Sequence, residues 1–130
     1  MKEKARVGYK SEIKGLRFEQ RVGSHFSKKG WQIKFRKRIS GGEIDIYGEL
    51  EEFLSGKSFL LVECKDKDLV SKADVMRFMR KVTDFYKRLP GGLFGEKPSV
   101  KVVLAYTGKV DSDAKAVGAS FKPKIEFKKF

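Results

Sequence analysis

The chain has 130 residues, of which 30 are Lys or Arg and 17 are Asp or Glu, so its net charge is +13 at pH 7. This length is enough for one domain with a single core, and we expect residues 1–130 to form one domain. The only cysteine, Cys64, excludes a disulfide or a cysteine-based zinc site within the chain, and we expect a cytoplasmic protein. No apolar run approaches the ~20 residues that cross a bilayer, so we expect no membrane partner.

The excess of positive charge indicates a polyanionic partner more strongly than it indicates any fold. Nucleic acid is the first candidate. The alternative is a generic lysine-rich surface, although such surfaces usually carry matching acids, which are too few here.

A first helix is predicted from residue 11 to about residue 29, with Ser11 as the N-cap and Gly30 as the stop. We expect residues 1–10 and the last three residues to be disordered. The prediction of a helix depends on apolar residues at helical spacing, which are Leu16, Phe18, Val22 and Phe26.

Three strands are predicted next, over residues 31–39, 43–48 and 58–65, and they form a meander. A tight turn at 40–42 joins the first two, and an acidic connection at 49–56 joins the second to the third. Alternation places the apolar residues of each strand on a shared face, so Ile39 shares a face with Ile33, and Ile46 shares a face with Ile44.

A second helix is predicted from Ser71 because Ser71-Lys72-Ala73-Asp74 has the form of a capping box, and Pro90 stops it. A fourth strand at 100–106 lacks alternation, which is typical of a strand covered on both faces. A short helix at 111–119 and a strand at 123–127 follow. The fold class is therefore α/β, in the order α-β-β-β-α-β-(α-β), with a mixed sheet and helices on both faces.

Three acids stand out from this pattern. Glu19 lies within the apolar face of the first helix, where a carboxylate either reaches solvent at the edge or is deliberately buried. Asp45 follows the glycine turn on the second strand, and Glu63 ends the apolar part of the neighbouring third strand. Lys65 shares a face with Glu63, while the Cys64 thiol points into the core.

Carboxylates that converge repel each other, and a divalent cation or the Lys65 ammonium relieves that repulsion. Oxygen ligands of this kind suit magnesium or manganese. The alternative, a salt-bridge network around Lys65 with no metal, stays open at this point because it accounts for each residue singly.

This arrangement resembles the PD-(D/E)xK nuclease superfamily, the fold of many restriction enzymes. The similar features, spread over residues 12–107, are an acid on the first helix (Glu19), an acid on the second strand (Gly42-Glu43-Ile44-Asp45) and E-x-K on the third (Glu63-Cys64-Lys65). The chain looks most like archaeal Holliday junction resolvases and small RecB-like endonucleases. It departs from the motif at Ile44, where the name of the superfamily calls for proline, and Glu43 is an additional acid beside Asp45.

The resemblance implies a single nuclease-like domain with Glu19, Asp45, Glu63 and Lys65 as catalytic residues. Asp45, Glu63 and the Cys64 backbone carbonyl would hold Mg²⁺, for which Mn²⁺ substitutes, and Glu19 would bind the ion or order its waters. Lys65 would orient the attacking water and offset charge on the phosphate.

Basic residues near this centre are candidates for binding the nucleic-acid backbone, and they are Lys34, Arg36, Lys37, Arg38, Lys67 and Lys72. The first four also fit a solvated edge strand that blocks aggregation. The outer face of the second helix, which includes Arg77, Arg80 and Lys81, is either a second binding surface or an ordinary solvated face.

The sequence therefore predicts a Mg²⁺-dependent DNA endonuclease, structure-selective or nonspecific, because little chain is left for reading bases. By resemblance to junction resolvases, a homodimer is expected. Two alternatives stay open: a nuclease-fold protein that binds nucleic acid without cutting it, and a nuclease directed at RNA.

Overall fold

The computed structural model describes residues 2–54, 56–91 and 97–130, and side chains from residue 15 onward within these ranges. The elements, in chain order, are α1 (Lys2–Ser27), β1 (Gln32–Ile39), β2 (Gly42–Glu52), β3 (Gly56–Lys65), β4 (Leu69–Val70), α2 (Lys72–Arg88), β5 (Val100–Tyr106), β6 (Lys109–Val110), α3 (Ser112–Ser120) and β7 (Ile125–Lys129). None of the helices in these ranges is long and apolar enough to cross a membrane.

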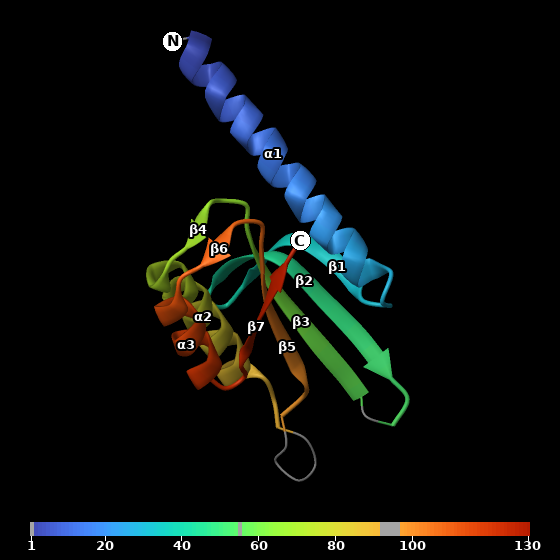
Figure 1. Ribbon diagram of the computed structural model, residues 1–130. Coiled ribbons are helices and arrows are strands. Elements are labelled where there is room, and N and C mark those ends of the chain that lie inside the picture. Colours follow the sequence, from blue (N-terminus) through green and yellow to red (C-terminus); the bar gives the residue numbers. More distant parts are fainter. Residues whose placement is uncertain (1, 55, 92–96) are drawn as a thin grey trace.

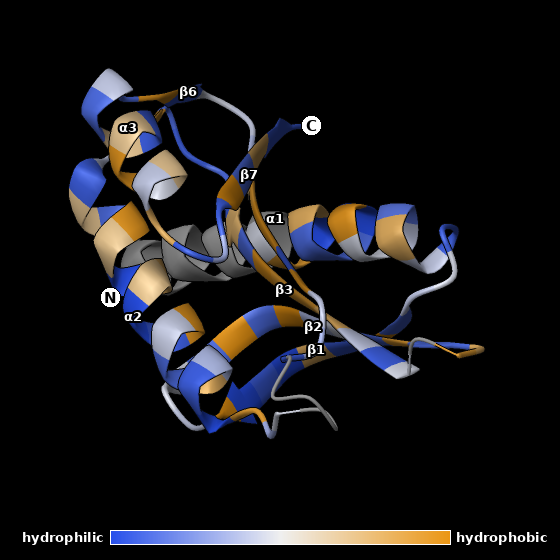
Figure 2. Ribbon diagram, turned by 90° about the horizontal axis from the view of Figure 1, so that it is seen from below, coloured by the Kyte–Doolittle hydropathy of each residue, from blue (hydrophilic) through white to orange (hydrophobic). Residues whose placement is uncertain are grey.

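The main sheet has five strands in the order β1-β2-β3-β5-β7. β1, β2 and β3 pair antiparallel, whereas β3, β5 and β7 pair parallel. α1 lies across one face of this sheet, and α2 and α3 cover the other (Figures 1 and 2). The predicted mixed α/β sheet with helices on both faces is therefore confirmed.

Each face of the sheet has its own hydrophobic cluster. On the α1 side, Phe18, Val22 and Phe26 of the helix pack against Leu60 and Val62 of β3. On the other side, α2 contributes a larger set that packs on the alternate residues of the same strands, and it comprises Val75, Phe78, Met79 and Val82. The central strands are buried on both faces, as the lack of alternation in residues 102–105 predicts.

The start of α2 is the best-specified local feature. The Ser71 side chain accepts from the Asp74 N–H at 3.2 Å, and the Asp74 carboxylate accepts from the Ser71 N–H at 2.9 Å. This reciprocal pair is the predicted capping box, and it fixes the direction in which α2 leaves the loop after β3.

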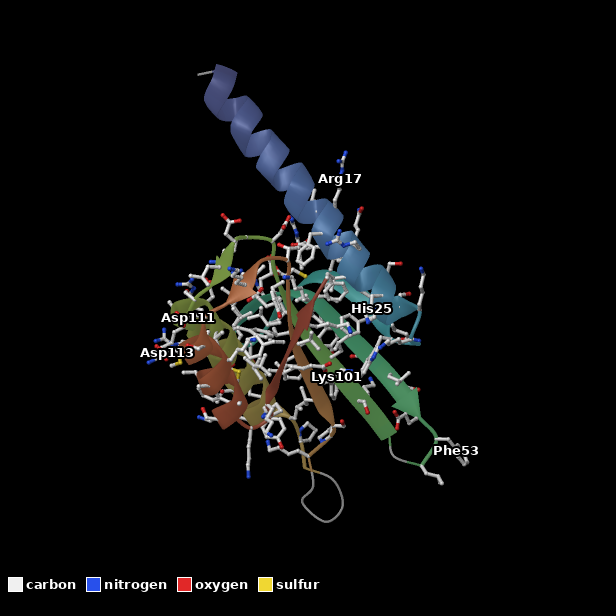
Figure 3. All side chains as sticks on the ribbon, viewed as in Figure 1. Arg17, His25, Phe53, Lys101, Asp111 and Asp113 are labelled. Carbon is white, nitrogen blue, oxygen red and sulfur yellow. The ribbon has the colours of Figure 1, made fainter. Side chains whose placement is uncertain are left out.

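The structure differs from the sequence prediction at several element ends. α1 begins at Lys2, not at Ser11. β2 continues to Glu52 through a segment predicted as a loop, because it pairs with the start of β3, and Phe53 projects from the tip of this hairpin (Figure 3). The last residues are not disordered: β7 runs to Lys129, and the Phe130 N–H donates to the Tyr106 carbonyl at 2.9 Å.

The simple alternation predicted for the first two strands is wrong. Ile44 packs in the α2-side cluster, but Ile46, two residues later, packs in the α1-side cluster. Likewise, Ile33 packs on the α1 side and Ile39 on the α2 side. The change of face on β1 coincides with Arg36, whose φ of 52° is left-handed, and the register steps from Phe35–Ile46 to Lys37–Ile44 across Arg36 and Asp45. Both strands therefore change face at the level of Asp45.

Candidate active site

β2 and β3 separate just before the predicted acids. Their pairing ends at Ile46 and Val62, so Asp45 and Glu63 lie where the two strands diverge. At this fork, the Asp45 side chain takes the place of a ladder partner, because its Oδ2 accepts from the Cys64 N–H at 2.8 Å. This bond holds the Asp45 carboxylate against β3.

The carboxyl groups of Asp45 and Glu63 interact directly. Glu63 is only 7% exposed. Burial raises the pKa of Glu63 to about 8, helped by a hydrogen bond to the Asp45 side chain and by the Asp45 charge, while Lys81 and Lys65 oppose the rise. At neutral pH the two groups therefore tend to share a proton unless a cation binds between them.

Lys81 of α2 is part of this centre, although the sequence placed it on an outer helix face that either binds nucleic acid or is simply solvated. Its Nζ donates to the Glu43 carbonyl oxygen at 2.8 Å and lies 3.4 Å from Glu63 Oε2. A signal was present in the spacing: Lys81 lies three residues after Phe78 and four before Phe85, so it flanks the apolar stripe of α2.

Lys65 lies on the same side of β3 as Glu63. Both face the α2 side of the sheet, whereas Cys64 packs with the α1-side cluster, as alternation predicts. The charge of Lys65 acts on Glu63 and on Asp74, the buried acid at the start of α2. Burial raises the pKa of the Cys64 thiol, and the charges of Asp45, Glu19 and Glu63 raise it further, so the thiol stays protonated at neutral pH.

Glu19 reaches the fork from the α1 side but pairs with Arg36. Arg36 Nε lies 3.4 Å from Glu19 Oε2, and the Glu19 side chain is 13% exposed. Burial raises the pKa of Glu19, the Asp45 charge adds to this, and Arg36 opposes it. Within the part of the chain that the structure describes, no three His, Cys, Asp or Glu residues form a group that could hold a metal ion. The structure thus brings Asp45 and Glu63 together and leaves Glu19 beside them.

The donor set nevertheless fits a hard divalent ion. Asp45 and Glu63 offer oxygen ligands only, their proximity is unfavourable when both are ionised, and Mg²⁺ is commonly held by one or two carboxylates together with waters and substrate phosphate.

The basic residues predicted to bind nucleic acid have different surroundings. Lys34, Arg38 and Lys72 are exposed. Lys37 lies over the Tyr47 ring, 5.5 Å from its centroid. Lys67 Nζ is 2.6 Å from Asp74 Oδ2, while Arg77 donates to Asp74 Oδ1 at 2.7 Å. The buried carboxylate thus holds two largely exposed cations side by side at the start of α2.

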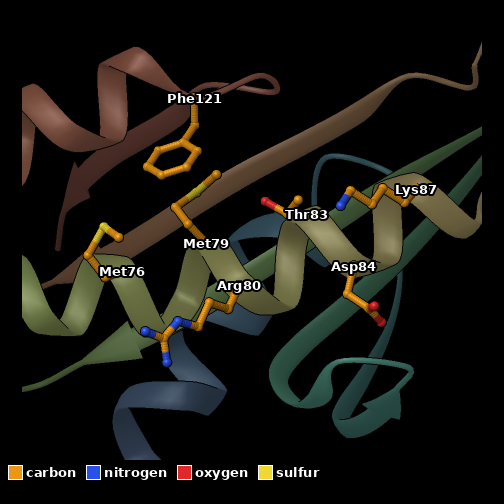
Figure 4. Close-up of a pocket in the computed structure, with 7 residues that line it drawn as sticks. All are labelled: Met76, Met79, Arg80, Thr83, Asp84, Lys87 and Phe121. Carbon is orange, nitrogen blue, oxygen red and sulfur yellow. The ribbon is translucent and has the colours of Figure 1, made fainter.

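A hollow of about 290 Å³ lies elsewhere on α2, beside Phe121 (Figure 4). It contains none of the predicted site residues. Its lining is Met76, Met79, Arg80, Thr83, Asp84, Lys87 and Phe121.

Comparison with known proteins gives a family and a similar fold. Residues 11–128 match the model of the Mrr_cat family, which is described as restriction endonuclease. The chain is also similar to the crystal structure of AF1548, a protein of unknown function, with a TM-score of 0.61 and 16% sequence identity over 85% of this chain and 55% of that one. The chain thus spans about half of that protein, and the likeness concerns the fold alone. No curated protein matches the chain.

The expected resemblance to PD-(D/E)xK nucleases is confirmed at the level of the superfamily, whereas the closer similarity to Holliday junction resolvases stays a prediction. Since the matched segment covers nearly the whole length, the chain belongs to the Mrr_cat family of restriction endonucleases.

Proposed function

We propose that the chain is a Mg²⁺-dependent endonuclease that hydrolyses DNA phosphodiester bonds. We infer that it selects its substrate by DNA structure or cuts nonspecifically, and does not recognise a base sequence. The observation that carries the proposal is the contact between the Asp45 and Glu63 carboxyl groups at the fork of β2 and β3. Membership of a restriction endonuclease family supports nuclease activity on DNA. The net charge of +13 supports binding of a polyanion.

Asp45 and Glu63 would hold the ion, and the fork supports a role for the Cys64 backbone as well. In an extended strand the N–H and C=O of one residue point to the same side, so the Cys64 carbonyl is directed with its N–H toward Asp45. Lys65 would orient the attacking water and offset phosphate charge, and Glu19 would order waters at the rim. When bound, the divalent ion would lower the pKa of a coordinated water and neutralise charge on the phosphate.

The test uses purified protein with Mg²⁺ or Mn²⁺ and four DNAs: plasmid, single strand, splayed duplex and four-way junction. We expect nicking that Asp45→Asn or Glu63→Gln reduces at least about 100-fold while binding persists. Glu126→Gln is the matched control, because it removes an exposed carboxylate on β7. Cutting that survives both active-site changes would refute the proposal.

A second candidate, a protein that binds nucleic acid without cutting it, is favoured by the ion pairs at the site. Arg36 is paired with Glu19, and Lys81 with Glu63, so two of the three acids have a cationic partner without a metal. This candidate predicts that the protein binds all four DNAs and cleaves none of them with either Mg²⁺ or Mn²⁺.

Two further features are proposed from the resemblance alone. The first is preference for DNA over RNA, which matched DNA and RNA substrates of one sequence and shape test directly. The second is a homodimer, for which the mass in solution at working concentration is the measurement.

A further inference from the structure

Lys81 connects α2 to both strands of the fork. Its bond to the Glu43 carbonyl is 2.8 Å long, whereas its contact with Glu63 Oε2 is 3.4 Å. The shorter bond anchors the ammonium to the main chain of β2. The longer ion pair can therefore be given up while Lys81 stays in place.

The turn between β1 and β2 is packed directly on Lys81. A Cβ on Gly41 would lie 2.9 Å from the Lys81 Cα and 3.2 Å from its carbonyl oxygen. A Cβ on Gly42, whose φ is +132°, would come within 3.6–3.8 Å of the Lys81 side-chain carbons. The aliphatic part of Lys81 thus runs along the turn toward Glu43, and its side chain is only 27% exposed. Packing of the aliphatic part therefore fixes the position of the Lys81 ammonium.

An ammonium at this position conflicts with a divalent ion on the same carboxylate. The Lys81 ammonium and a divalent ion would both bind the carboxylate oxygens of Glu63, and the two cations repel each other at short range. Asp45 does not remove the conflict, since one of its oxygens already accepts from Cys64.

We propose that Lys81 is a positioning residue that competes with the divalent cation for Glu63 and thereby weakens metal binding to the free protein. The inference rests on the metal-dependent site proposed above. A nucleic-acid phosphate attracts both cations. When the substrate binds, Lys81 therefore moves off Glu63 but keeps its bond to the Glu43 carbonyl. Metal binding to Glu63 then becomes stronger.

The test measures Mn²⁺ binding at fixed pH without nucleic acid, from the electron paramagnetic resonance signal of free Mn²⁺. Lys81→Gln and Lys81→Met remove the charge, and Lys81→Met keeps an unbranched aliphatic chain in case the first variant folds poorly. We expect about tenfold tighter Mn²⁺ binding in both. Lys81→Arg, which keeps the charge, should stay within about twofold of wild type.

Two controls separate the possible failures. Arg80→Gln removes a neighbouring exposed charge from α2, at the hollow shown in Figure 4, and should leave the affinity unchanged. Asp45→Asn reports whether Mn²⁺ binds at the fork at all. If Asp45→Asn binds Mn²⁺ as tightly as the wild type, the metal site at the fork is refuted. The proposed competition is then refuted as well. If binding depends on Asp45 but charge removal at Lys81 leaves it unchanged or weaker, the competition alone is overturned.

Discussion

At the residue scale, Asp45 is the acid whose charge acts both on Glu63, on the α2 side of the sheet, and on Glu19, on the α1 side. Glu63 faces α2 and Glu19 belongs to α1, so regular strands would keep them on opposite faces. The change of face at Asp45, at the level of the left-handed Arg36 of β1, lies between them. The Asp45 charge then acts on both acids. The local irregularity of β1 and β2 is what creates the centre.

The raised pKa of Glu63 predicts that metal-free protein loses stability as the pH rises. The unfolded chain ionises Glu63 near 4.5, while the folded chain keeps the proton to about 8. The contribution is therefore fully present below pH 4.5 and is lost as the pH rises through 8, with a slope of up to about 1.4 kcal/mol per pH unit. Urea unfolding in EDTA at several pH values measures this slope. Glu63→Gln should remove it and Glu126→Gln should not, and identical profiles for wild type and Glu63→Gln would contradict the assignment.

The lowered pKa of Asp74 predicts the opposite dependence of stability on pH. Burial alone would raise the pKa of Asp74, but hydrogen bonds from Lys67 and the Ser71 backbone, with nearby positive charge, hold it at about 2. The unfolded value is 3.8, so the stabilisation is present above that pH and is lost as the pH falls through 2. We expect Asp74→Asn to cost on the order of 1–2 kcal/mol at pH 7 and almost nothing near pH 2. Asp113→Asn, at an exposed position on α3, is the control. A cost that stays constant with pH would exclude this cause.

At the element scale, the features that depend on local pattern could be predicted and those that depend on distant pairing could not. The capping box at Ser71 specifies α2 from four consecutive residues, and the apolar run 102–105 specifies β5. The β4–β6 pair could not be predicted, because each strand has two residues and no periodicity. The Lys81 contact could not be predicted either, because it depends on where the Gly41-Gly42 turn packs on α2.

The β4–β6 pair requires the backbone at Gly108 to lie close to the backbone of the loop before β4. A Cβ there would collide with the backbone carbonyls of Lys67 and Asp68, next to the Lys109 N–H bond to the Asp68 oxygen at 2.9 Å. We expect Gly108→Ala to destabilise the fold by about 2 kcal/mol or more. Gly15→Ala, in α1 with nothing within 4 Å, should instead stabilise by about 0.5–1 kcal/mol. Thermal unfolding compares the two, and a neutral Gly108→Ala would mean that the two loops separate readily.

At the scale of the whole molecule, the charge is spread over the chain but the candidate site is at one end of the sheet. Glu63 and Lys65 are at the end of β3, whereas Lys101, at the start of β5, pairs in register with Leu60 nearer the other end. Lys34 and Arg38 are exposed on β1, the edge strand that turns into β2 before Asp45. If the net charge of +13 acts only as a general attraction, every exposed cation contributes alike. If a phosphate backbone lies across the fork, the cations of β1 contribute more.

Salt titration of DNA binding distinguishes these two cases. Each phosphate contact that is lost lowers the slope of log affinity against log salt by roughly one. We therefore expect Lys34→Ala and Arg38→Ala to lower the slope by about one each and to weaken binding to all sequences alike. Lys101→Ala changes the net charge by the same amount, but Lys101 pairs in register with Leu60, three residues before Glu63, and its Nζ is 3.6 Å from Glu126 Oε2. It should leave the slope unchanged. Equal slopes for all three variants would mean that the charge attracts nucleic acid without directing it to the fork, and the proposed placement of the duplex over Asp45 and Glu63 would have to be abandoned.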